Sequence, residues 1–163
     1  MQAATEFGTA IADNGWRLVY GAGDVGLMGA VARAAHDNGA ETFGVIPTHL
    51  LGKEKGKRDL TTFVITENMH ERKKVMFMNS DAIVVLPGGA GSLDEFFEVL
   101  TWKQIGLHEK PIFLLSTDGY WTPLRSLIDH IVAQGFATGE TAGYFETVET
   151  VPELVAALRA RRT

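Results

Sequence analysis

The segment Pro87–Glu95, which reads PGGAGSLDE, has the residue types and spacing with the clearest chemical meaning. It follows an apolar run, Ala82–Leu86, and leads directly into a helical pattern. Glycines let a backbone approach a ligand closely, and the start of a helix adds free N–H groups and a partial positive charge. The segment therefore predicts an anion site, most naturally for phosphate. It is not a Walker loop, because no Lys-Ser/Thr pair follows the glycines.

Two roles are open for Glu95. Ser92 and Glu95 have the S-x-x-E spacing of a capping box, in which the glutamate only satisfies a backbone N–H at the helix start. The carboxylate could instead act on a ligand. Since a carboxylate and a phosphate repel each other, a functional Glu95 would have to face another part of that ligand, such as a sugar.

A second charged segment, Met69–Lys74, reads MHERKK and predicts a helix. Arg72 and Lys73 could form charge-assisted bonds to a phosphate, although a charged helix start is also typical of a solvated face. From His49 to Lys74 there are seven Lys or Arg and four Asp or Glu, in a chain whose net charge is −5. This basic segment favours either a small anionic ligand or a solvated loop.

An earlier glycine cluster starts at Gly21 and matches the dinucleotide fingerprint G-x-G-x-x-G. That fingerprint also needs an acidic residue at the end of the next strand. Glu41 precedes that strand, so NAD binding is disfavoured. We expect Gly21 and Gly23 to face a ligand at the carboxyl end of a strand, and Gly26 and Gly29 to allow close packing of the following helix.

The elements that must position these residues alternate between strands and helices. Five apolar runs predict strands: Arg17–Tyr20, Phe43–Ile46, Phe63–Ile65, Ala82–Leu86 and Ile112–Leu115. Most lack polar alternation, which is typical of parallel strands buried on both faces. Helical spacing fills the intervals, and a last helix is expected from Val151 to about Arg159. The pattern predicts an α/β fold, with a doubly wound parallel sheet and helices on both faces, in a single domain over residues 1–163.

Residues 2–13 predict an amphipathic helix that ends at Asn14-Gly15. Since a doubly wound domain usually begins with a strand, either the chain begins late in the fold or an upstream segment, the fold's first strand, is missing from this sequence.

The amino-acid composition excludes or disfavours several classes of function. The chain has 163 residues, no cysteine and 18 glycines, seven of them in the turns at 21–29 and 88–91. A disulfide framework and a cysteine nucleophile are excluded. The acidic balance disfavours a nucleic-acid polymer as partner, and no apolar run approaches the ~20 residues that span a membrane. We expect a cytoplasmic protein.

Four motifs together resemble one family closely. They are GAGDVGLMG from Gly21, MHERK from Met69, PGGAGSLDEFFEVLTW from Pro87 and KPIFLLSTDGYW from Lys110. In order and spacing they resemble the LOG ("Lonely Guy") family of cytokinin riboside 5′-monophosphate phosphoribohydrolases, many of which were once labelled possible lysine decarboxylases. The resemblance implies a Rossmann-like fold, a homodimer, and hydrolysis of AMP or N6-modified AMP to the free base and ribose 5-phosphate without metal or cofactor.

The resemblance also implies roles for individual residues. Arg72 and Glu95 match the family's catalytic pair, and Ser92 replaces the usual threonine while keeping the hydroxyl. A carboxylate at that place would stabilise positive charge on the ribose as the N-glycosidic bond breaks. The implied substrate-binding residues are Glu54, Arg72, Lys73, Gly88, Gly89, Ala90, Gly91, Ser92, Leu93, Asp94, Glu95 and Thr101, in addition to Gly21 and Gly23.

Other hypotheses stay open beside this one. A non-catalytic nucleotide or molybdenum-cofactor carrier could use the same fold, and retention of both Arg72 and Glu95 favours the enzyme. An NAD-dependent oxidoreductase depends on the first glycine cluster alone. Decarboxylation is disfavoured because no lysine has a pyridoxal-phosphate context. Trp102 and Trp121 are expected in the core or a subunit contact, with base stacking as the alternative, and Asp118-Gly119 predicts a turn at the rim of the site.

Overall fold

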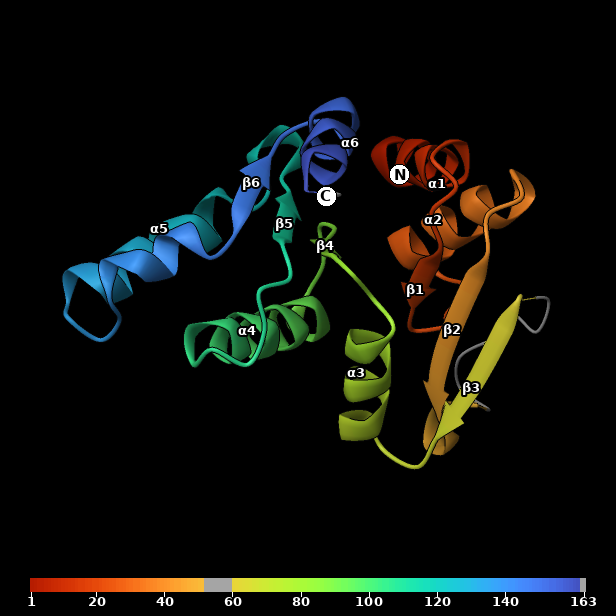
Figure 1. Ribbon diagram of the computed structural model, residues 1–163, viewed down its shortest axis with the longest axis horizontal. Coiled ribbons are helices and arrows are strands. Elements are labelled where there is room, and N and C mark those ends of the chain that lie inside the picture. The colour runs from red at the N-terminus through yellow and green to blue at the C-terminus, as the bar shows by residue number, and fades with distance from the viewer. Residues whose placement is uncertain (52–59, 162–163) are drawn as a thin grey trace. The chain divides into compact units, whose positions relative to one another are not determined.

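A computed structural model describes residues 1–51 and 60–161, and these form two compact units, Met1–Ser80 and Asp81–Thr163 (Figure 1). Each unit contains a three-stranded sheet whose strand pairs are all parallel. The fold class is therefore the predicted one, α/β with parallel sheets flanked by helices. That the whole chain makes one domain stays a prediction.

The first unit alternates helices and strands in chain order. Its elements are α1 (Gln2–Asp13), β1 (Leu18–Tyr20), α2 (Gly26–Asp37), β2 (Thr42–Pro47), the short helix η1 (Thr48–Leu50), β3 (Thr62–Thr66) and α3 (Met69–Met78). The strand order is β1-β2-β3, and the register pairs Val19 with Phe43 and Val45 with Val64. The central strand β2 is buried along its whole length, as expected for a parallel strand covered on both faces.

The helices of the first unit pack closely on one another and on the sheet. α2 lies against β1 and β2, and α3 lies against β2 and β3. α1 packs on α2 at Gly8, where an added Cβ would overlap the backbone oxygen of Val31. The glycine therefore allows the close approach of the two helices.

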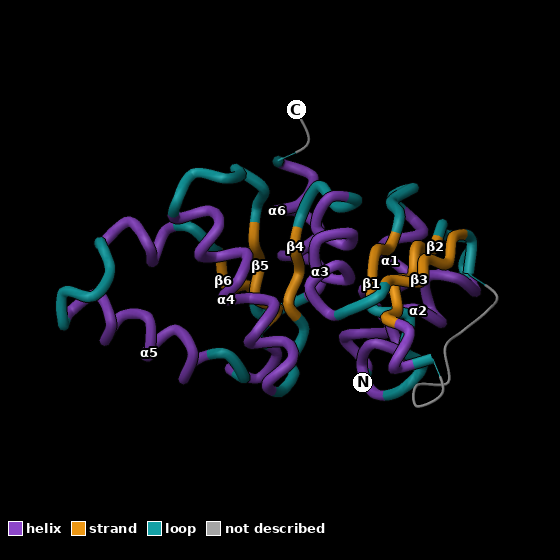
Figure 2. Tube along the Cα trace, turned by 90° about the horizontal axis from the view of Figure 1, so that it is seen from below, coloured by secondary structure: helices purple, strands orange, loops and turns teal. Residues whose placement is uncertain are grey.

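The second unit repeats the alternation. Its elements are β4 (Ile83–Val85), α4 (Ala90–Gln104), β5 (Ile112–Leu115), η2 (Thr117–Gly119), α5 (Thr122–Ala133), η3 (Gly139–Gly143), β6 (Glu146–Val148) and α6 (Val151–Ala160). Figure 2 shows β5 between β4 and β6, as the strand order requires. Phe96 of α4 meets Phe145 edge to face, with ring centroids 5.4 Å apart, in the core of this unit.

All five predicted strands and the helices predicted at 2–13 and after Val151 are confirmed, with ends shifted by at most one residue. The sixth strand, β6, escaped the sequence analysis because only Val148 of its residues is buried and the strand lies at the sheet edge. Strand order and direction place the segments after β1, β2 and β3 at one edge of the first sheet, and those after β4, β5 and β6 at one edge of the second.

Candidate active site

Arg72 is buried at the carboxyl edge of the first sheet. Only 7 % of its surface is exposed, whereas its neighbours His70 and Lys74 on α3 are exposed. Its Nη2 donates to the carbonyl of Gly21 at 2.7 Å, and its Nε donates to the carbonyl of Val45 at 3.2 Å. The guanidinium therefore ties α3 to the turn after β1 and to the strand β2.

The start of α3 is defined by a local cap. The Asn68 side chain accepts the backbone N–H of Glu71 at 3.0 Å, and the Glu71 carboxylate accepts the N–H of Glu67 at 2.8 Å. These bonds satisfy donors that the first helical turn would otherwise leave open. The same arrangement starts α6, where Thr150 accepts from Glu153. The cap of α3 fixes the turn that carries Arg72.

The first glycine turn is shaped around Arg72. A Cβ added at Gly21 would overlap Nη2 of that arginine, so only glycine fits while the guanidinium holds its place. Ala22 follows with a φ of 59°, and Gly26 begins α2 with a φ of 60°. Gly29 packs against the backbone of Asp24, whose carboxylate pairs with Arg33 of α2. The packing role predicted for Gly29 is confirmed.

The packing role predicted for Gly26 is wrong. Apart from its chain neighbours and the backbone of its own helix, no described residue has an atom within 4 Å of a Cβ added there. The glycine is favoured because its backbone is left-handed. Glu41 precedes β2, as the sequence indicated, so it lies at the edge of the sheet opposite to the glycine turn.

The second glycine loop ends at the start of α4. The N-cap residue is Gly89, and Ser92 lies inside the first turn. The capping-box alternative for Ser92 and Glu95 therefore does not hold, because the helix begins before Ser92 rather than after it. Its N-cap residue is a glycine, which has no side chain to offer to the first free N–H groups. A helix start of this kind is suited to binding an anion.

The glycines of this loop fall into two kinds. A Cβ added at Gly88 would overlap Oγ of Ser92, so packing requires a glycine there. At Gly89 and Gly91 an added Cβ would meet nothing within 4 Å, and neither residue has a positive φ. Packing in the second unit does not require glycine at these two positions. Gly89 is favoured as the N-cap residue, and close approach by a ligand is a further physical reason for both glycines.

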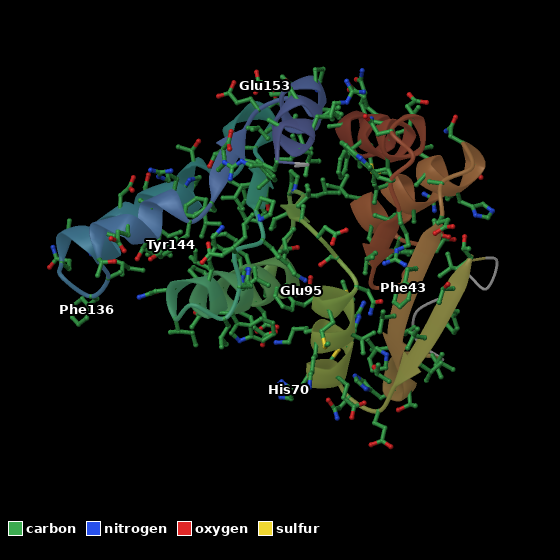
Figure 3. The ribbon with its side chains drawn as sticks, viewed as in Figure 1. Phe43, His70, Glu95, Phe136, Tyr144 and Glu153 are labelled. Carbon is green, nitrogen blue, oxygen red and sulfur yellow. The ribbon has the colours of Figure 1, made fainter. Side chains whose placement is uncertain are left out.

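α4 brings some of the predicted residues together and separates others. Glu95, which is half-buried, lies four residues after Gly91 and therefore on the same helix face one turn later. Thr101 lies ten residues after Gly91, about 15 Å further along the helix axis. Figure 3 shows Glu95 on α4 and His70 on α3. The predicted catalytic pair thus draws Arg72 from the first unit and Glu95 from the second.

The remaining predicted residues also have definite places. Gly23 is buried in the first glycine turn, Lys73 is half-buried on α3, and Ala90 and Asp94 are exposed in the first turns of α4, where Leu93 is half-buried. Glu54 lies outside the described residues. Trp121 is 4 % exposed, as expected for a core residue.

Two features of the site were missed by the sequence analysis. The Tyr120 hydroxyl donates to the carbonyl of Gly88 at 2.8 Å, and Asp24 pairs with Arg33. The tyrosine follows the predicted Asp118-Gly119 turn directly, which was a usable signal.

Across residues 1–51 and 60–161, no group of three or more His, Cys, Asp or Glu side chains is placed to hold a metal ion. No helix in the same ranges has the length and apolar character needed to cross a membrane.

The fold and these two loops define a class of α/β protein in which two parallel strands end in glycine turns. The second of these turns leads into a helix that carries a carboxylate about one turn from its start. A family model described as "Possible lysine decarboxylase" matches residues 28–158. Together with the relatives described next, this match shows that the chain belongs to the LOG family, as the motifs indicated.

Two curated relatives illustrate the similarity. "Cytokinin riboside 5′-monophosphate phosphoribohydrolase LOG" of Oryza sativa subsp. japonica is 42 % identical over 153 residues, which cover 94 % of this chain and 63 % of the rice protein. The cytokinin riboside 5′-monophosphate phosphoribohydrolase of Rhodococcoides fascians is 42 % identical over 160 residues, which cover 98 % of this chain and 81 % of that protein. The chain thus spans somewhat less than two thirds of the rice relative.

Solved structures share the fold at lower identity. The molybdenum cofactor carrier protein of Chlamydomonas reinhardtii has a TM-score of 0.74 at 23 % identity, covering 98 % of this chain and 85 % of that chain. The molybdenum cofactor binding protein of Rippkaea orientalis has a TM-score of 0.73 at 20 % identity, covering 99 % of this chain and 87 % of that chain. At this identity the likeness shows a common fold.

Proposed function

We propose that this protein hydrolyses the N-glycosidic bond of AMP or an N6-substituted AMP, giving the free base and ribose 5-phosphate. The names of relatives about 40 % identical over nearly the whole chain support the reaction class. The observation that carries the proposal is local to α4. Gly89 and Gly91 leave open space at a helix start, and Glu95 lies one turn behind them on the face of Gly91.

This arrangement suits a nucleoside monophosphate. The glycine loop and the helix start would bind the phosphate through backbone N–H groups. The ribose would then extend along α4 toward Glu95, away from the phosphate charge. A carboxylate there stabilises the positive charge that develops on the ribose ring and orients a water molecule. The water oxygen bonds to C1′, the electron pair of the C1′–N9 bond stays with the base, and the base gains a proton.

Arg72 and Lys73 would supply positive charge to the anionic substrate, as the LOG resemblance implies. The carbonyls of Gly21 and Val45 and the sulfur of Met69 use three of the five N–H donors of Arg72. Within residues 1–51 and 60–161 the other two have no acceptor, so they could bind an anionic group while the guanidinium is already held in place. We therefore propose Arg72 and Glu95 as the catalytic pair. The other substrate-binding residues are proposed as the LOG resemblance assigns them, and so is a homodimer.

The test is an assay of base and ribose 5-phosphate release from AMP and from N6-isopentenyladenosine monophosphate. We expect release from at least one of them and its loss in Glu95→Gln, with the thermal unfolding curve unchanged. Glu140→Gln is the control, because Glu140 is an exposed carboxylate in η3 of the same unit. Tight binding without turnover would reject the enzyme in favour of a carrier. Turnover that persists in Glu95→Gln would remove Glu95 from the chemistry.

A further inference from the structure

Tyr120 links the end of one strand to the glycine loop after another. Its hydroxyl donates to the carbonyl of Gly88 at 2.8 Å, between residues 32 positions apart in the sequence. We propose that Tyr120 is a positioning residue: by holding the Gly88 carbonyl it sets the direction of the Gly89 N–H, which binds the phosphate of the nucleotide. This inference depends on the proposed function for the identity of the ligand.

The tyrosine is held in place by the turn that precedes it. Asp118 and Gly119 are successive residues with left-handed φ values of 54° and 72°, which reverse the chain sharply after β5. The next residue, Trp121, is 4 % exposed, and its backbone N–H donates to Oγ of Ser116 at 2.9 Å. The Trp121 ring meets the Tyr120 ring edge to face at 4.8 Å. A buried anchor therefore supports the Tyr120 ring from one side.

The other partner, Gly88, is confined as well. Ser92 of α4 occupies the space where a Cβ at Gly88 would lie. With its carbonyl bound by Tyr120, Gly88 has contacts that fix both its Cα and its oxygen. The peptide after it is flanked by glycines on both sides and would otherwise rotate easily.

The orientation of this peptide decides what the loop offers to an anion. The described chain contains no cis peptide bond, and in a planar trans peptide the N–H points opposite to the C=O. Holding the Gly88 oxygen toward Tyr120 therefore turns the Gly89 N–H away from Tyr120. Gly89 is the N-cap of α4, so this N–H lies next to the free N–H groups of the first helical turn. In residues 1–51 and 60–161 this N–H donates no hydrogen bond, so it is available to a ligand.

A tyrosine that only stabilised the fold would be expected to be buried. Tyr120 is 50 % exposed, while Trp121 beside it provides the buried anchor. A hydrogen bond open to water contributes little to the free energy of unfolding, because water replaces the lost partner. Removing the hydroxyl should thus leave the fold intact and release the Gly88–Gly89 peptide, which separates a positioning role from a structural one.

The decisive variant is Tyr120→Phe, which removes the hydroxyl and keeps the ring. We expect KM for AMP, and the Kd of AMP measured by calorimetry, to rise about tenfold, the effect of losing one well-placed hydrogen bond to a charged group. We expect kcat to change less than about twofold and the melting temperature to change little, since the chemistry and the core are untouched. The amide 15N and 1H shifts of Gly89 should move in the ligand-free protein.

Tyr144→Phe is the matched control. The Tyr144 hydroxyl donates to Glu140 at 3.2 Å in the same unit, so this variant removes an equivalent group outside the loop. It should leave KM, Kd and the Gly89 shifts unchanged.

Three results would overturn the inference: an unchanged Gly89 shift in Tyr120→Phe, an unchanged Kd for AMP, or a loss confined to kcat. If the wild-type protein binds AMP but releases no base, the proposed hydrolysis fails, and the Gly89 shift and the Kd still decide the role of Tyr120. If the wild-type protein does not bind AMP at all, both proposals fail.

Discussion

The guanidinium of Arg72 donates to the carbonyl of Gly21 at 2.7 Å, across 51 positions of sequence. Through this bond the helix α3 holds the turn that follows β1, and the same side chain reaches Val45 in β2. A residue that the motifs assign to catalysis is therefore also part of the framework of the first unit. Its substitution should affect the fold and the reaction in ways that can be measured separately.

Arg72→Lys should reduce both the stability of the protein and its activity. Lysine keeps the charge but cannot donate from two nitrogens to two carbonyls in a fixed geometry. We expect a decrease of about 2 kcal/mol in the free energy of unfolding, since buried acceptors lose charged donors. Under the proposed function, kcat/KM should fall at least about a hundredfold. Urea unfolding and the base-release assay measure the two changes.

The control for this substitution is Arg125→Lys, because Arg125 pairs with Asp129 at 3.3 Å on the surface. It should change the unfolding free energy by less than about 0.5 kcal/mol. A stability loss in Arg72→Lys no larger than in this control would contradict the framework role.

Gly89→Ala and Gly91→Ala should weaken ligand binding while they leave the fold intact. Both positions have room for a Cβ, and neither has a positive φ. At Gly91, inside α4, alanine should leave the free energy of unfolding within about 0.5 kcal/mol or raise it, because alanine favours a helix over glycine. At Gly89 it should lower that free energy by no more than about 1 kcal/mol, because Gly89 is the N-cap and alanine caps a helix less well than glycine. The Kd for AMP should increase about tenfold or more, since the methyl group would occupy the space of the phosphate. Calorimetry and thermal unfolding give the two quantities.

Gly139→Ala is the matched control, with equal room for a Cβ but a position in η3. It should leave the Kd for AMP unchanged. Equal affinity in all three variants would show that the open glycines serve no ligand.

Asn68→Ala should weaken the start of α3. The Asn68 side chain accepts from the Glu71 N–H at 3.0 Å, and loss of such an N-cap costs about 1 kcal/mol of unfolding free energy. Because this first turn carries Arg72, we also expect a lower kcat/KM for AMP. Thr150→Ala removes the corresponding cap of α6 at a similar cost. Its kcat/KM should match the wild type, and a parallel loss in both variants would attribute the effect to general destabilisation.

Gly26→Ala should destabilise the protein for a conformational reason. The φ of Gly26 is 60°, and alanine is strained there by about 1 kcal/mol although no neighbour lies within 4 Å. Gly26→Asn should be milder, since asparagine tolerates this region better than alanine. The order of the two melting temperatures is the measurement, and a more stable alanine variant would refute the explanation.

The fold was largely predictable because its signals are local. Buried parallel strands such as Ile112–Leu115 are dense apolar runs, and their identity needs no knowledge of the rest of the chain. β6 gave no such signal, because two of its three residues are exposed. Its pairing with β5 depends on where the chain returns after η3, which no short window reveals.

The site was less predictable, because its contacts join residues that are far apart in the sequence. The burial of Arg72 depends on acceptors 27 and 51 residues away, while its immediate neighbours indicate a charged surface. The S-x-x-E spacing of Ser92 and Glu95 allowed a helix start after Ser92, because this pattern describes a cap regardless of the glycines that precede it. The structure places the start at Ala90. Sequence patterns locate a helix end only to within a few residues, and here those residues separate the two roles that were open for Glu95.

In each glycine loop, the side chain of another residue occupies the space where the Cβ of one glycine would lie. At Gly21 the Cβ position is filled by the Arg72 guanidinium, and at Gly88 by the Ser92 hydroxyl. Each of these glycines can therefore be replaced only if the side chain that fills its Cβ position changes as well. A larger residue at position 21 should be tolerated only together with a shorter side chain at position 72. One at position 88 should be tolerated only with glycine at position 92, because the Ser92 Cβ also overlaps the added Cβ. This coupling constrains which substitutions can accumulate in either loop during evolution, independently of what the loop binds.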